Sequence, residues 1–439
     1  MRSVFEVADI QQSVFARPHH SRGISAPRPL TFRAESQMSH TSKSIVYVWD
    51  ADYPWDVRTE KVTLALARAG HSVHIVARNR AWKQTTETLP EGTVHRMMPW
   101  KPLGRRLDNA LSFPAFFSPR WISLIDRTCR EAKADLIIVR DLPLCPTAIS
   151  CGKRLDIPVM LDMAENYPAM MRVLWETGRD TLFDYFARNP SITAKVERRC
   201  VRNVDHIIVV VEESADRVAA LGIPRSKLTV VSNTPPLARL DCPSHEPSST
   251  RATTDVVYMG NLEVVRGLLE AIDAVAHLKN EGKRIRLRVI GRGRDEALVR
   301  DRAASLGLTA EDVEFLGYIA SHAEALRVVA ESDVGLIPHR KNESWDTTIP
   351  NKLFDYMAAG LPVVSSDAAP CARIIRETGS GRIFRSGDAI ELATAIEEVA
   401  RPDIAAILGA SGRTAVRNRY NWEYDTAVLL GAVDAIKKQ

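Results

Sequence analysis

Short apolar runs alternate with amphipathic stretches along most of this chain. In the first half, each apolar run has the length of a buried strand, and the segments between runs carry apolar residues at helical spacing, such as Val62, Ala65 and Leu66. Strands and helices in alternation are typical of a parallel sheet covered by helices. We predict strands over 44–49, 72–77, 135–139, 157–161, 205–211 and 228–231.

The second half repeats the pattern more regularly, after a stretch rich in Pro, Ser and Thr. The predicted fold class is therefore α/β, with two Rossmann-like, doubly wound domains that face a cleft. In such sheets ligands bind beyond the carboxyl ends of the strands. We predict strands over 255–259, 285–290, 313–316, 333–337 and 363–364, and helices over 264–279 and 323–330.

These patterns divide the chain into four parts. Residues 1–43 are polar and basic without a sustained period, which predicts a disordered tail. A first domain over 44–238 and a second domain over 255–439 are joined by a linker over 239–254. The tail lacks the apolar core of a secretion signal, and Met38 is an alternative start.

One stretch of the second domain, TIPNKLFDYMAAGLPVVSSD over 348–367, predicts a helix with Pro350 in its first turn and Gly360 at its end. Lys352 falls in the first turn, where the helix dipole favours an anion over a cation. Asp355 lies on the same face, where a carboxylate can accept hydrogen bonds from two vicinal hydroxyls. The pair therefore predicts a phosphate and ribose site. The alternative is a Lys352–Asp355 ion pair on a solvated surface.

Arg266 repeats this pattern, because it stands with Gly267 at the start of a predicted helix. Two cations at helix N-termini on one sheet edge favour a diphosphate, although each alone is more often a surface residue. Gly260, Gly291 and Gly293 follow predicted strands and indicate close backbone approach. The G-x-G at Gly291 is not the full dinucleotide fingerprint.

The first domain places polar residues at its own strand ends. Asp50, Asp52 and Asp56 share one loop with aromatic residues, which suits either a sugar acceptor or a helix N-cap in a packed loop. The same two interpretations apply to the strand-end pair Arg140-Asp141 and to the segment DMAENY over 162–167, where Asp162 or Glu165 can reach the cleft.

Residues 100–121 (WKPLGRRLDNALSFPAFFSPRW) alternate cations with aromatic residues and leucines. Such a surface suits an anionic membrane face or a lipid-linked acceptor. Ordinary packing under a loop is the alternative.

Composition narrows the function classes. The formal charge of +5 over 439 residues gives no reason to expect a nucleic-acid partner. The 6 cysteines are scattered without metal-ligand spacing, which argues against structural zinc and for reduced thiols in the cytoplasm. No apolar run approaches the length of about 20 residues that spans a bilayer. We expect a cytoplasmic protein with, at most, peripheral contact at the inner membrane face.

Several motifs carry a family resemblance. They are YMGNLEVVRGLLEAIDA, RVIGRGRD, VEFLGYI, SDVGLIPH, the stretch over 348–367 and the closing RNRYNWEY, with looser matches in ARAGHSVHIVA and VDHIIVVVEESADRVAALGIPRSKLTVVSN. From residue 44 onward, the chain resembles GT-B glycosyltransferases of the retaining group 1, or GT4-like, family. This resemblance implies an acceptor-side first domain, a donor-binding second domain, and a last helix, after Trp422, that crosses back to the first domain.

By the same resemblance, the second domain would bind a nucleotide sugar. Arg266 would hold the diphosphate, Lys352 would make a further phosphate contact, and Asp355 would replace the glutamate that holds the ribose. Tyr318 and Ile319 lie where the backbone meets the base. The remaining substrate-binding candidates in these motifs are Gly260, Asn261, Gly291, Gly293, Thr348 and Asn351.

The chain also departs from the family pattern. Thr347 stands where the first acid of a two-glutamate motif is expected, and Glu343 and Asp346 are the nearby acids that can substitute. Asn261 replaces a common arginine, and Arg140-Asp141 replaces a strand-end histidine. The first loop lacks the usual pair of glycines.

We therefore predict transfer of a hexose-type sugar from a nucleoside diphosphate to a hydroxyl of a saccharide or lipid-linked acceptor. The reaction would retain configuration, need no metal or other cofactor, and serve cell-surface polysaccharide or glycolipid synthesis. The predicted catalytic residues are Arg266, Lys352 and Asp162. The alternatives are a non-catalytic nucleotide-sugar-binding subunit, motivated by Thr347, and a nucleotide-sugar epimerase on the same fold.

Overall fold

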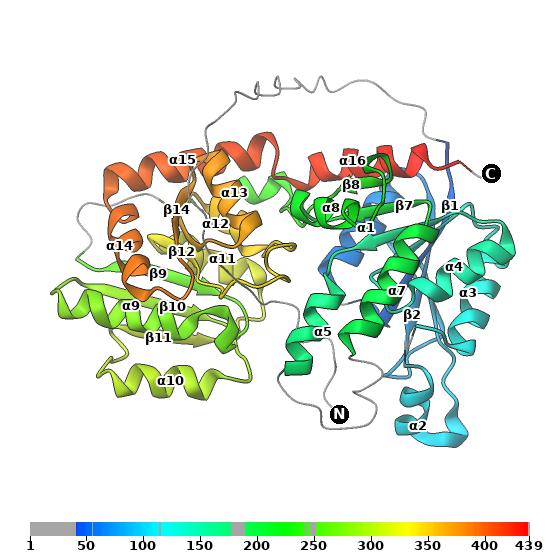
Figure 1. The fold of residues 1–439 in the computed structure, drawn as a ribbon, viewed down its shortest axis with the longest axis horizontal. Helices are drawn as coiled ribbons and strands as arrows, with labels where there is room; N and C mark the ends of the chain where they lie inside the picture. Colours follow the sequence, from blue (N-terminus) through cyan, green and yellow to red (C-terminus); the bar gives the residue numbers. More distant parts are fainter. Residues whose placement is uncertain are drawn as a thin grey trace.

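The computed structural model describes residues 41–54, 56–113, 116–176, 189–241, 244–245 and 252–437. It has two α/β domains side by side (Figure 1), and it confirms the predicted fold class. The predicted disordered tail lies outside the described residues except for 41–43, as does much of the predicted linker.

The N-terminal domain is built on one sheet with the strand order β3-β4-β2-β1-β5-β6-β7-β8. All neighbouring strands are parallel except β3 and β4. The sequence prediction missed the edge strand β3 and its neighbour β4, because both are rich in threonine and charge and carry no apolar run. The strands are β1 (Ser44–Asp52), β2 (Ser72–Arg78), β3 (Thr86–Leu89), β4 (Gly92–Arg96), β5 (Leu136–Arg140), β6 (Val159–Met163), β7 (His206–Val209) and β8 (Leu228–Val230).

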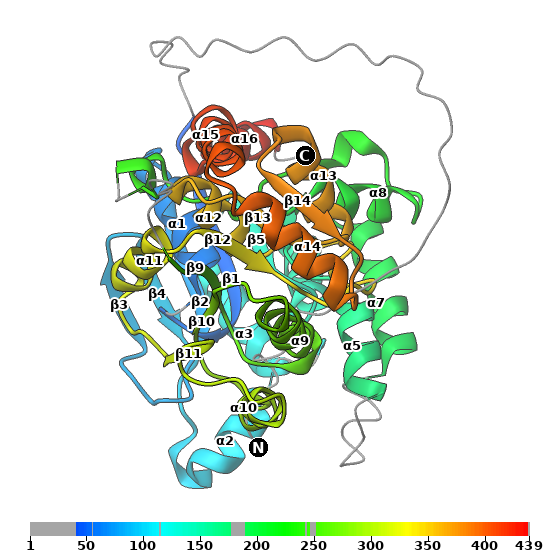
Figure 2. The same cartoon turned by 90° about the vertical axis from the view of Figure 1, so that its left-hand side faces the viewer.

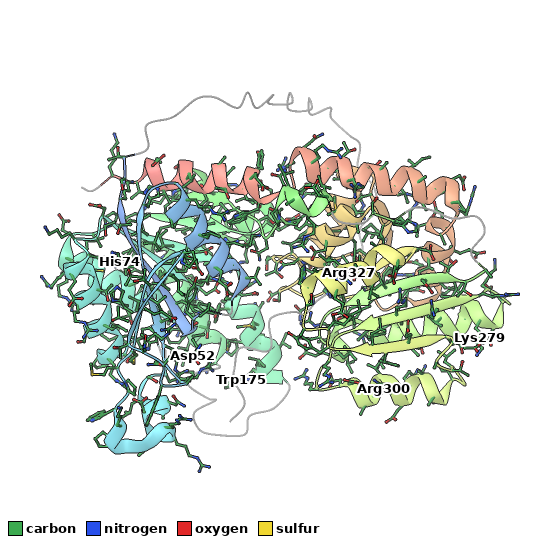
Figure 3. All side chains as sticks on the ribbon, turned by 180° about the vertical axis from the view of Figure 1, so that it is seen from behind. Asp52, His74, Trp175, Lys279, Arg300 and Arg327 are labelled. Carbon is green, nitrogen blue, oxygen red and sulfur yellow. The ribbon has the colours of Figure 1, made fainter. Side chains whose placement is uncertain are left out.

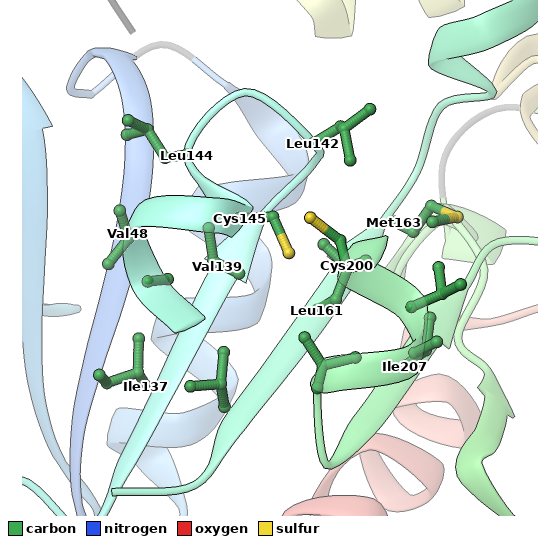
Figure 4. Close-up of a cluster of buried hydrophobic side chains, with 14 of the residues drawn as sticks. Val48, Ile137, Val139, Leu142, Leu144, Cys145, Leu161, Met163, Cys200 and Ile207 are labelled. Atoms are coloured by element: carbon green, nitrogen blue, oxygen red, sulfur yellow. The ribbon is translucent and has the colours of Figure 1, made fainter. Parts of the chain in front are cut away.

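Helices cover both faces of this sheet. Alternate strand residues belong to two separate cores, with Val46 and Val48 in one and Ile45 and Tyr47 in the other. Figure 4 shows part of the first core, where Cys145 and other helix residues meet the strands. The helices are α1 (Val57–Arg68), α2 (Gly104–Leu111), α3 (Pro119–Glu131), α4 (Cys145–Leu155), α5 (Tyr167–Glu176), α7 (Pro190–Asn203) and α8 (Glu212–Ala219), with short 3-10 turns at Lys101–Leu103, Arg225–Lys227 and Leu237–Asp241.

The C-terminal domain has a fully parallel sheet with the order β11-β10-β9-β12-β13-β14. Its strands are β9 (Thr254–Met259), β10 (Ile285–Ile290), β11 (Val313–Gly317), β12 (Val334–Ile337), β13 (Val363–Ser366) and β14 (Gly381–Phe384). Its helices are α9 (Leu268–Asn280), α10 (Glu296–Ser305), α11 (His322–Glu331), α12 (Lys352–Ala359), α13 (Ala369–Thr378), α14 (Ala389–Val399), α15 (Pro402–Asn418) and α16 (Trp422–Ala435).

Two predicted helix starts are wrong. Residues Val264–Arg266 form a 3-10 turn, and α9 begins only after Gly267, which has φ +72°. A Cβ at Gly267 would lie 1.7 Å from the carbonyl oxygen of Pro338, so the chain turns where only glycine fits. Similarly, α12 begins at Lys352 after Asn351, so Pro350 precedes the helix.

The end of the chain joins the two domains. In Figures 1 and 2, α15 and α16 run along one end of the molecule, and α16 lies over the N-terminal domain. Leu429 and Val433 of α16 are buried in the same core as Ile45 and Tyr47 of β1. The backbone N–H of Trp422 donates to the carbonyl of Pro235 at 2.8 Å.

Candidate active site

The loops that follow the strands of the two sheets contact each other between the domains. Asn166, after β6, donates from Nδ2 to Thr347 Oγ1 at 3.1 Å and to the Glu343 carbonyl at 3.3 Å. Arg172 of α5 forms an ion pair with Glu343. Figure 3 places Trp175, on the same helix, at the side of the N-terminal domain that faces its neighbour. The carboxyl edges of both sheets therefore meet at this interface.

Lys352 is the first residue of α12 and is buried. Its Nζ lies 3.1 Å from His339 Nε2 and 4.4 Å from the ring centroid of Tyr258. Among the described residues, no carboxylate lies within ion-pairing distance of Nζ. Burial, and then the charge of Arg266, lower the pKa of Lys352 well below its usual value. Burial and the charges of Lys352 and Arg266 also lower the pKa of His339, so His339 is neutral and its Nε2 accepts a hydrogen bond from Lys352.

Arg266 lies beside this lysine, at the end of the 3-10 turn before α9. It is 4% exposed, and burial lowers its pKa to about 9. Its Nε lies 3.6 Å from Glu263 Oε2. The structure thus brings together the two cations that the sequence singled out. Each has lost most of its hydration, and a bound anion would restore the lost stabilisation.

Glycines let the backbone approach this pair. A Cβ at Gly260, where φ is +151°, would lie 2.7 Å from Lys352 Nζ. Cβ atoms at Gly291 and Gly293 would lie 1.9 Å from the Gly260 carbonyl oxygen and 2.1 Å from that of Leu262. The predicted glycines therefore bring the loops after β9 and β10 together beside Lys352.

Asp355 lies on the next part of α12 and is 7% exposed. Its Oδ1 is 3.8 Å from Arg239 Nη1 and 4.0 Å from His322 Nε2. Burial raises its pKa against the opposing charges of these two groups. Lys352 and Asp355 are thus buried and have different neighbours, so the alternative of a solvated ion pair between them is wrong.

The other residues predicted to bind the nucleotide sugar are, with the exception of Thr348, more exposed than Lys352 and Asp355. The Tyr318 side chain is 69% exposed after β11, and Asn261 is exposed after β9. Thr348 is buried and donates to the Ser344 carbonyl at 3.1 Å, whereas Asn351 is exposed at the start of α12. Ile319 is half-buried beside Tyr318. Their contacts with a ligand stay predictions.

Acidic residues gather at the opposing edge, where β1, β5 and β6 end side by side. Asp50 is fully buried, and among the described residues neither of its carboxylate oxygens has a hydrogen-bond partner. Arg140 Nη1 donates to Asp141, and its Nε lies 3.8 Å from Asp56 Oδ1. Asp141 Oδ1 also accepts from the backbone N–H of Glu165 at 3.2 Å.

Burial raises the pKa values of three carboxyl groups in this cluster toward neutral pH. Burial and the neighbouring Asp141 raise the pKa of Asp50 to about 8. The same two causes raise the pKa of Glu165 to about 8. Burial raises the pKa of Asp141 to about 6, against the charge of Arg140. Groups that hold or release a proton near pH 7 at an interface are typical of functional sites.

The contacts of Asp162 favour a positioning role. Its predicted direct role in catalysis stays a prediction. Its carboxylate is fully buried and accepts from Arg58 Nη2 at 2.6 Å and from the hydroxyl of Tyr47 at 2.8 Å. Burial alone would raise its pKa, but the charges of Arg58 and Arg140 outweigh that effect and lower it. Asp162 thereby holds α1 against β1 and β6.

The packed-loop interpretation holds for two of the three loop aspartates. Asp56 caps α1 by accepting from the N–H of Thr59 at 2.7 Å. Asp52 forms an ion pair with Arg80 at 3.1 Å. Trp55, in the same loop, lies outside the described residues.

Sequence reasoning missed two residues of the site. His339 lies two residues after the end of β12, so the rule that ligands meet strand ends would have selected it. Arg239 lies in a segment predicted as a linker, where no local signal indicates a contact with Asp355.

Two family models match the chain. The model described as "Glycosyl transferase 4-like domain" matches residues 56–234, and "Glycosyl transferases group 1" matches residues 253–401. One match falls on each domain. The chain belongs to the group 1, GT4-like glycosyltransferases.

Individual members of the family are more distant. Phosphatidyl-myo-inositol mannosyltransferase of Mycobacterium leprae is 30% identical over 185 residues, which cover 41% of this chain and 46% of that protein. The colanic acid biosynthesis glycosyltransferase WcaL of Escherichia coli is 27% identical over 241 residues, which cover 54% and 58%. The chain thus spans about half the length of these relatives.

A solved structure extends the likeness to the whole fold. Anabaena HepE in complex with UDP and glucose has a TM-score of 0.66 and 14% sequence identity, covering 90% of this chain and 100% of that one. At this identity the match supports the arrangement of the two domains in a GT-B glycosyltransferase.

Proposed function

We propose that this glycosyltransferase moves a sugar from a nucleoside diphosphate to a hydroxyl of a saccharide or lipid-linked acceptor. One observation carries the proposal. Arg266 and Lys352 are buried side by side beside Gly260, and no carboxylate pairs with Lys352 among the described residues. Glu263 already lies 3.6 Å from Arg266, so one carboxylate offsets part of the charge of two desolvated cations, and a bound diphosphate would supply the remaining negative charge beside Lys352.

The same cations would act on the leaving group. When the bond between the anomeric carbon and the diphosphate oxygen breaks, the electron pair stays on that oxygen, and negative charge develops there. Arg266, Lys352 and the N–H groups at the starts of α9 and α12 stabilise this charge. His339 holds the Lys352 ammonium in place by accepting a hydrogen bond from it.

Asp355 would bind the ribose of the donor. Its buried carboxylate lies on the same helix as Lys352, three residues further along. A carboxylate there can accept two hydrogen bonds from vicinal hydroxyls, which places the nucleoside next to the diphosphate.

The acidic edge of the N-terminal domain would receive the acceptor. Asp141 and Glu165 lie beside Asn166, which contacts the donor-side loop. Asp141, with a pKa of about 6, is mostly ionised at pH 7 and can take up the proton that the acceptor oxygen loses as it bonds to the anomeric carbon. Glu165, with a pKa of about 8, is mostly protonated there and can donate a hydrogen bond to a sugar hydroxyl. The leaving diphosphate is the alternative proton acceptor, and it suits a reaction with retention.

The relatives support the acceptor class. One is named for transfer to a phosphatidyl-inositol lipid and one for colanic acid synthesis, and HepE was solved with UDP and glucose. We therefore propose a role in polysaccharide or glycolipid synthesis with a hexose donor, without a required metal.

The first test is a panel of UDP-, GDP-, ADP- and dTDP-sugars with membrane extracts as acceptor. We expect one donor to release nucleoside diphosphate, and we expect Lys352→Ala to abolish that release. Lys279→Ala is the matched control, since Lys279 lies at the outer side of the C-terminal domain (Figure 3). NMR of the anomeric proton of the product decides between retention and inversion.

A binding subunit without catalysis is the second candidate. Thr347 replaces the expected acid, and its hydroxyl is already bonded to Asn166 and to the Glu343 carbonyl at 2.8 Å. Donor binding by calorimetry without nucleotide release, from a folded protein, would support this candidate. Interconversion of the donor sugar without release would instead indicate an epimerase.

A further inference from the structure

Exposed apolar side chains concentrate on one short segment. Twelve large apolar side chains are exposed in the described part of the chain, and five of them lie between residues 98 and 117. They include a tryptophan and a phenylalanine, which are costly to leave in water. The five are Met98, Trp100, Leu107, Leu111 and Phe117.

This segment is held firmly to the domain by polar contacts. Asp108 of α2 is buried and accepts from Trp82 Nε1 at 3.1 Å, from the N–H of Trp100 at 2.8 Å and from Arg120 Nη1 at 2.9 Å. Burial alone would raise the pKa of Asp108, but these hydrogen bonds outweigh it and lower the pKa. The helix is therefore fixed with Leu107 and Leu111, one turn apart, facing solvent.

The charges around these apolar residues have one sign. Lys101, Arg105 and Arg106 are exposed, and Asp108 is the only acid between residues 97 and 118. Because Asp108 is buried and paired with Arg120, it does not offset the exposed cations. We call Met98, Trp100, Leu107, Leu111 and Phe117, together with the three exposed cations, the α2 surface.

The α2 surface has an open position in the molecule. In Figures 1 and 2, α2 projects at the end of the N-terminal domain opposite α16. A flat partner can therefore reach it without meeting α15 or α16.

We propose that the α2 surface binds the face of an anionic lipid bilayer. Aromatic and leucine side chains among lysine and arginine match the boundary between acyl chains and negative headgroups. A protein partner would need a complementary acidic groove, whereas an anionic bilayer accepts scattered apolar anchors and attracts each nearby cation. Among the described residues, no helix has both the length and the apolar composition of a membrane span. This inference is independent of the proposed donor site.

The test is flotation of the full chain with vesicles of phosphatidylcholine alone or mixed with phosphatidylglycerol. We expect binding to the anionic vesicles and at least a tenfold loss with Leu107→Gln/Leu111→Gln or with Lys101→Glu/Arg106→Glu. High salt should weaken the binding of the wild type. Circular dichroism and thermal unfolding verify that both variants fold.

Matched controls lie on helices at the opposite end of the molecule. Ile407→Gln removes an equally exposed apolar residue of α15, and Arg376→Glu/Arg417→Glu reverses two exposed cations of α13 and α15. These controls should bind as the wild type does. Absence of binding to anionic vesicles, or equal loss in the controls, would overturn the proposal. So would a dimer in solution that Leu107→Gln/Leu111→Gln dissociates, since the apolar face would then be a contact between two copies.

Discussion

The two sheet edges that meet between the domains carry different kinds of ionisable groups. The C-terminal edge holds Arg266 and Lys352, and burial lowers the pKa of each. The N-terminal edge holds several acids around Arg140, and burial raises the pKa of Asp50, Asp141 and Glu165. The same desolvation thus prepares one edge for an anion and the other for neutral, proton-bearing groups.

This difference is what a transferase between a charged donor and a hydroxyl acceptor requires. The donor loses a diphosphate, which needs positive charge. The acceptor loses a proton, which needs a base or a hydrogen-bond acceptor. Variants that remove the cations of one edge or the acids of the other therefore test the proposed function.

The largest effect is expected from the cationic edge. Arg266→Ala or Lys352→Ala should lower kcat by about a hundredfold to a thousandfold, since stabilisation of charge on the leaving group is lost. The thermal stability of Lys352→Ala should stay within a few degrees or rise, because a buried cation without a carboxylate partner is removed, whereas Arg266→Ala should be less stable because it leaves the buried Glu263 carboxylate without its cation. Steady-state kinetics and calorimetry measure both, with Lys279→Ala beside them. Activity within threefold of the wild type in Lys352→Ala would refute the assignment.

The raised pKa of Asp50, at the acidic edge, should make the free energy of unfolding depend on pH. The unfolded chain releases the Asp50 proton near pH 4, whereas the fold holds it to about 8. Between these values the folded state binds the extra proton, so the stability of the wild type falls as pH rises, by up to about 1.4 kcal/mol per unit for this group. Asp50→Asn should remove that slope, and its stability relative to the wild type should increase from pH 5 to 8.

Urea unfolding at several pH values measures this slope. Asp312→Asn is a suitable control, because hydrogen bonds and the charge of Lys279 outweigh burial and lower the pKa of Asp312. Asp312 is then ionised in both states above pH 5, and its effect stays constant. A constant difference for Asp50→Asn as well would contradict the raised pKa.

A smaller effect should identify the ribose site. Wild type should bind a ribonucleoside diphosphate about tenfold more tightly than its 2′-deoxy analogue, corresponding to one hydrogen bond to a charged group. Asp355→Asn should bind both analogues with similar affinity. Calorimetric titration of the two nucleotides into both proteins gives the coupling free energy between the Asp355 carboxylate and the 2′-hydroxyl. If the deoxy penalty persists in Asp355→Asn, another residue holds the ribose.

The smallest effect is expected at the contact between the edges. Asn166→Ala removes the hydrogen bonds to Thr347 and to the Glu343 carbonyl, with a cost of about 0.5–1.5 kcal/mol. We expect KM to rise a few fold while donor binding to the isolated nucleotide site changes little. Asn203→Ala, on an exposed part of α7, is the control. An unchanged KM would show that this contact between the two edges does not support catalysis.

Local patterns predicted most of the fold. Buried runs such as 285–290 were assigned correctly, because an apolar strand between turn residues is a short-range signal. The errors fall where tertiary contacts decide the backbone. The carbonyl of Pro338 packs against Gly267 and so delays α9, and β3 and β4 pair although neither has an apolar run.

The candidate site was also predicted only in part from the sequence. The sequence by itself determined the two α/β halves and the cations placed at strand and helix ends, because helix dipoles and periodicity depend on near neighbours. Only the tertiary structure decided that β9 lies between β10 and β12, which brings Gly260, Gly291 and His339 to one edge beside Lys352. Strand order and burial arise from contacts between distant segments, and burial is what turned an ordinary lysine and an ordinary aspartate into groups with shifted pKa values.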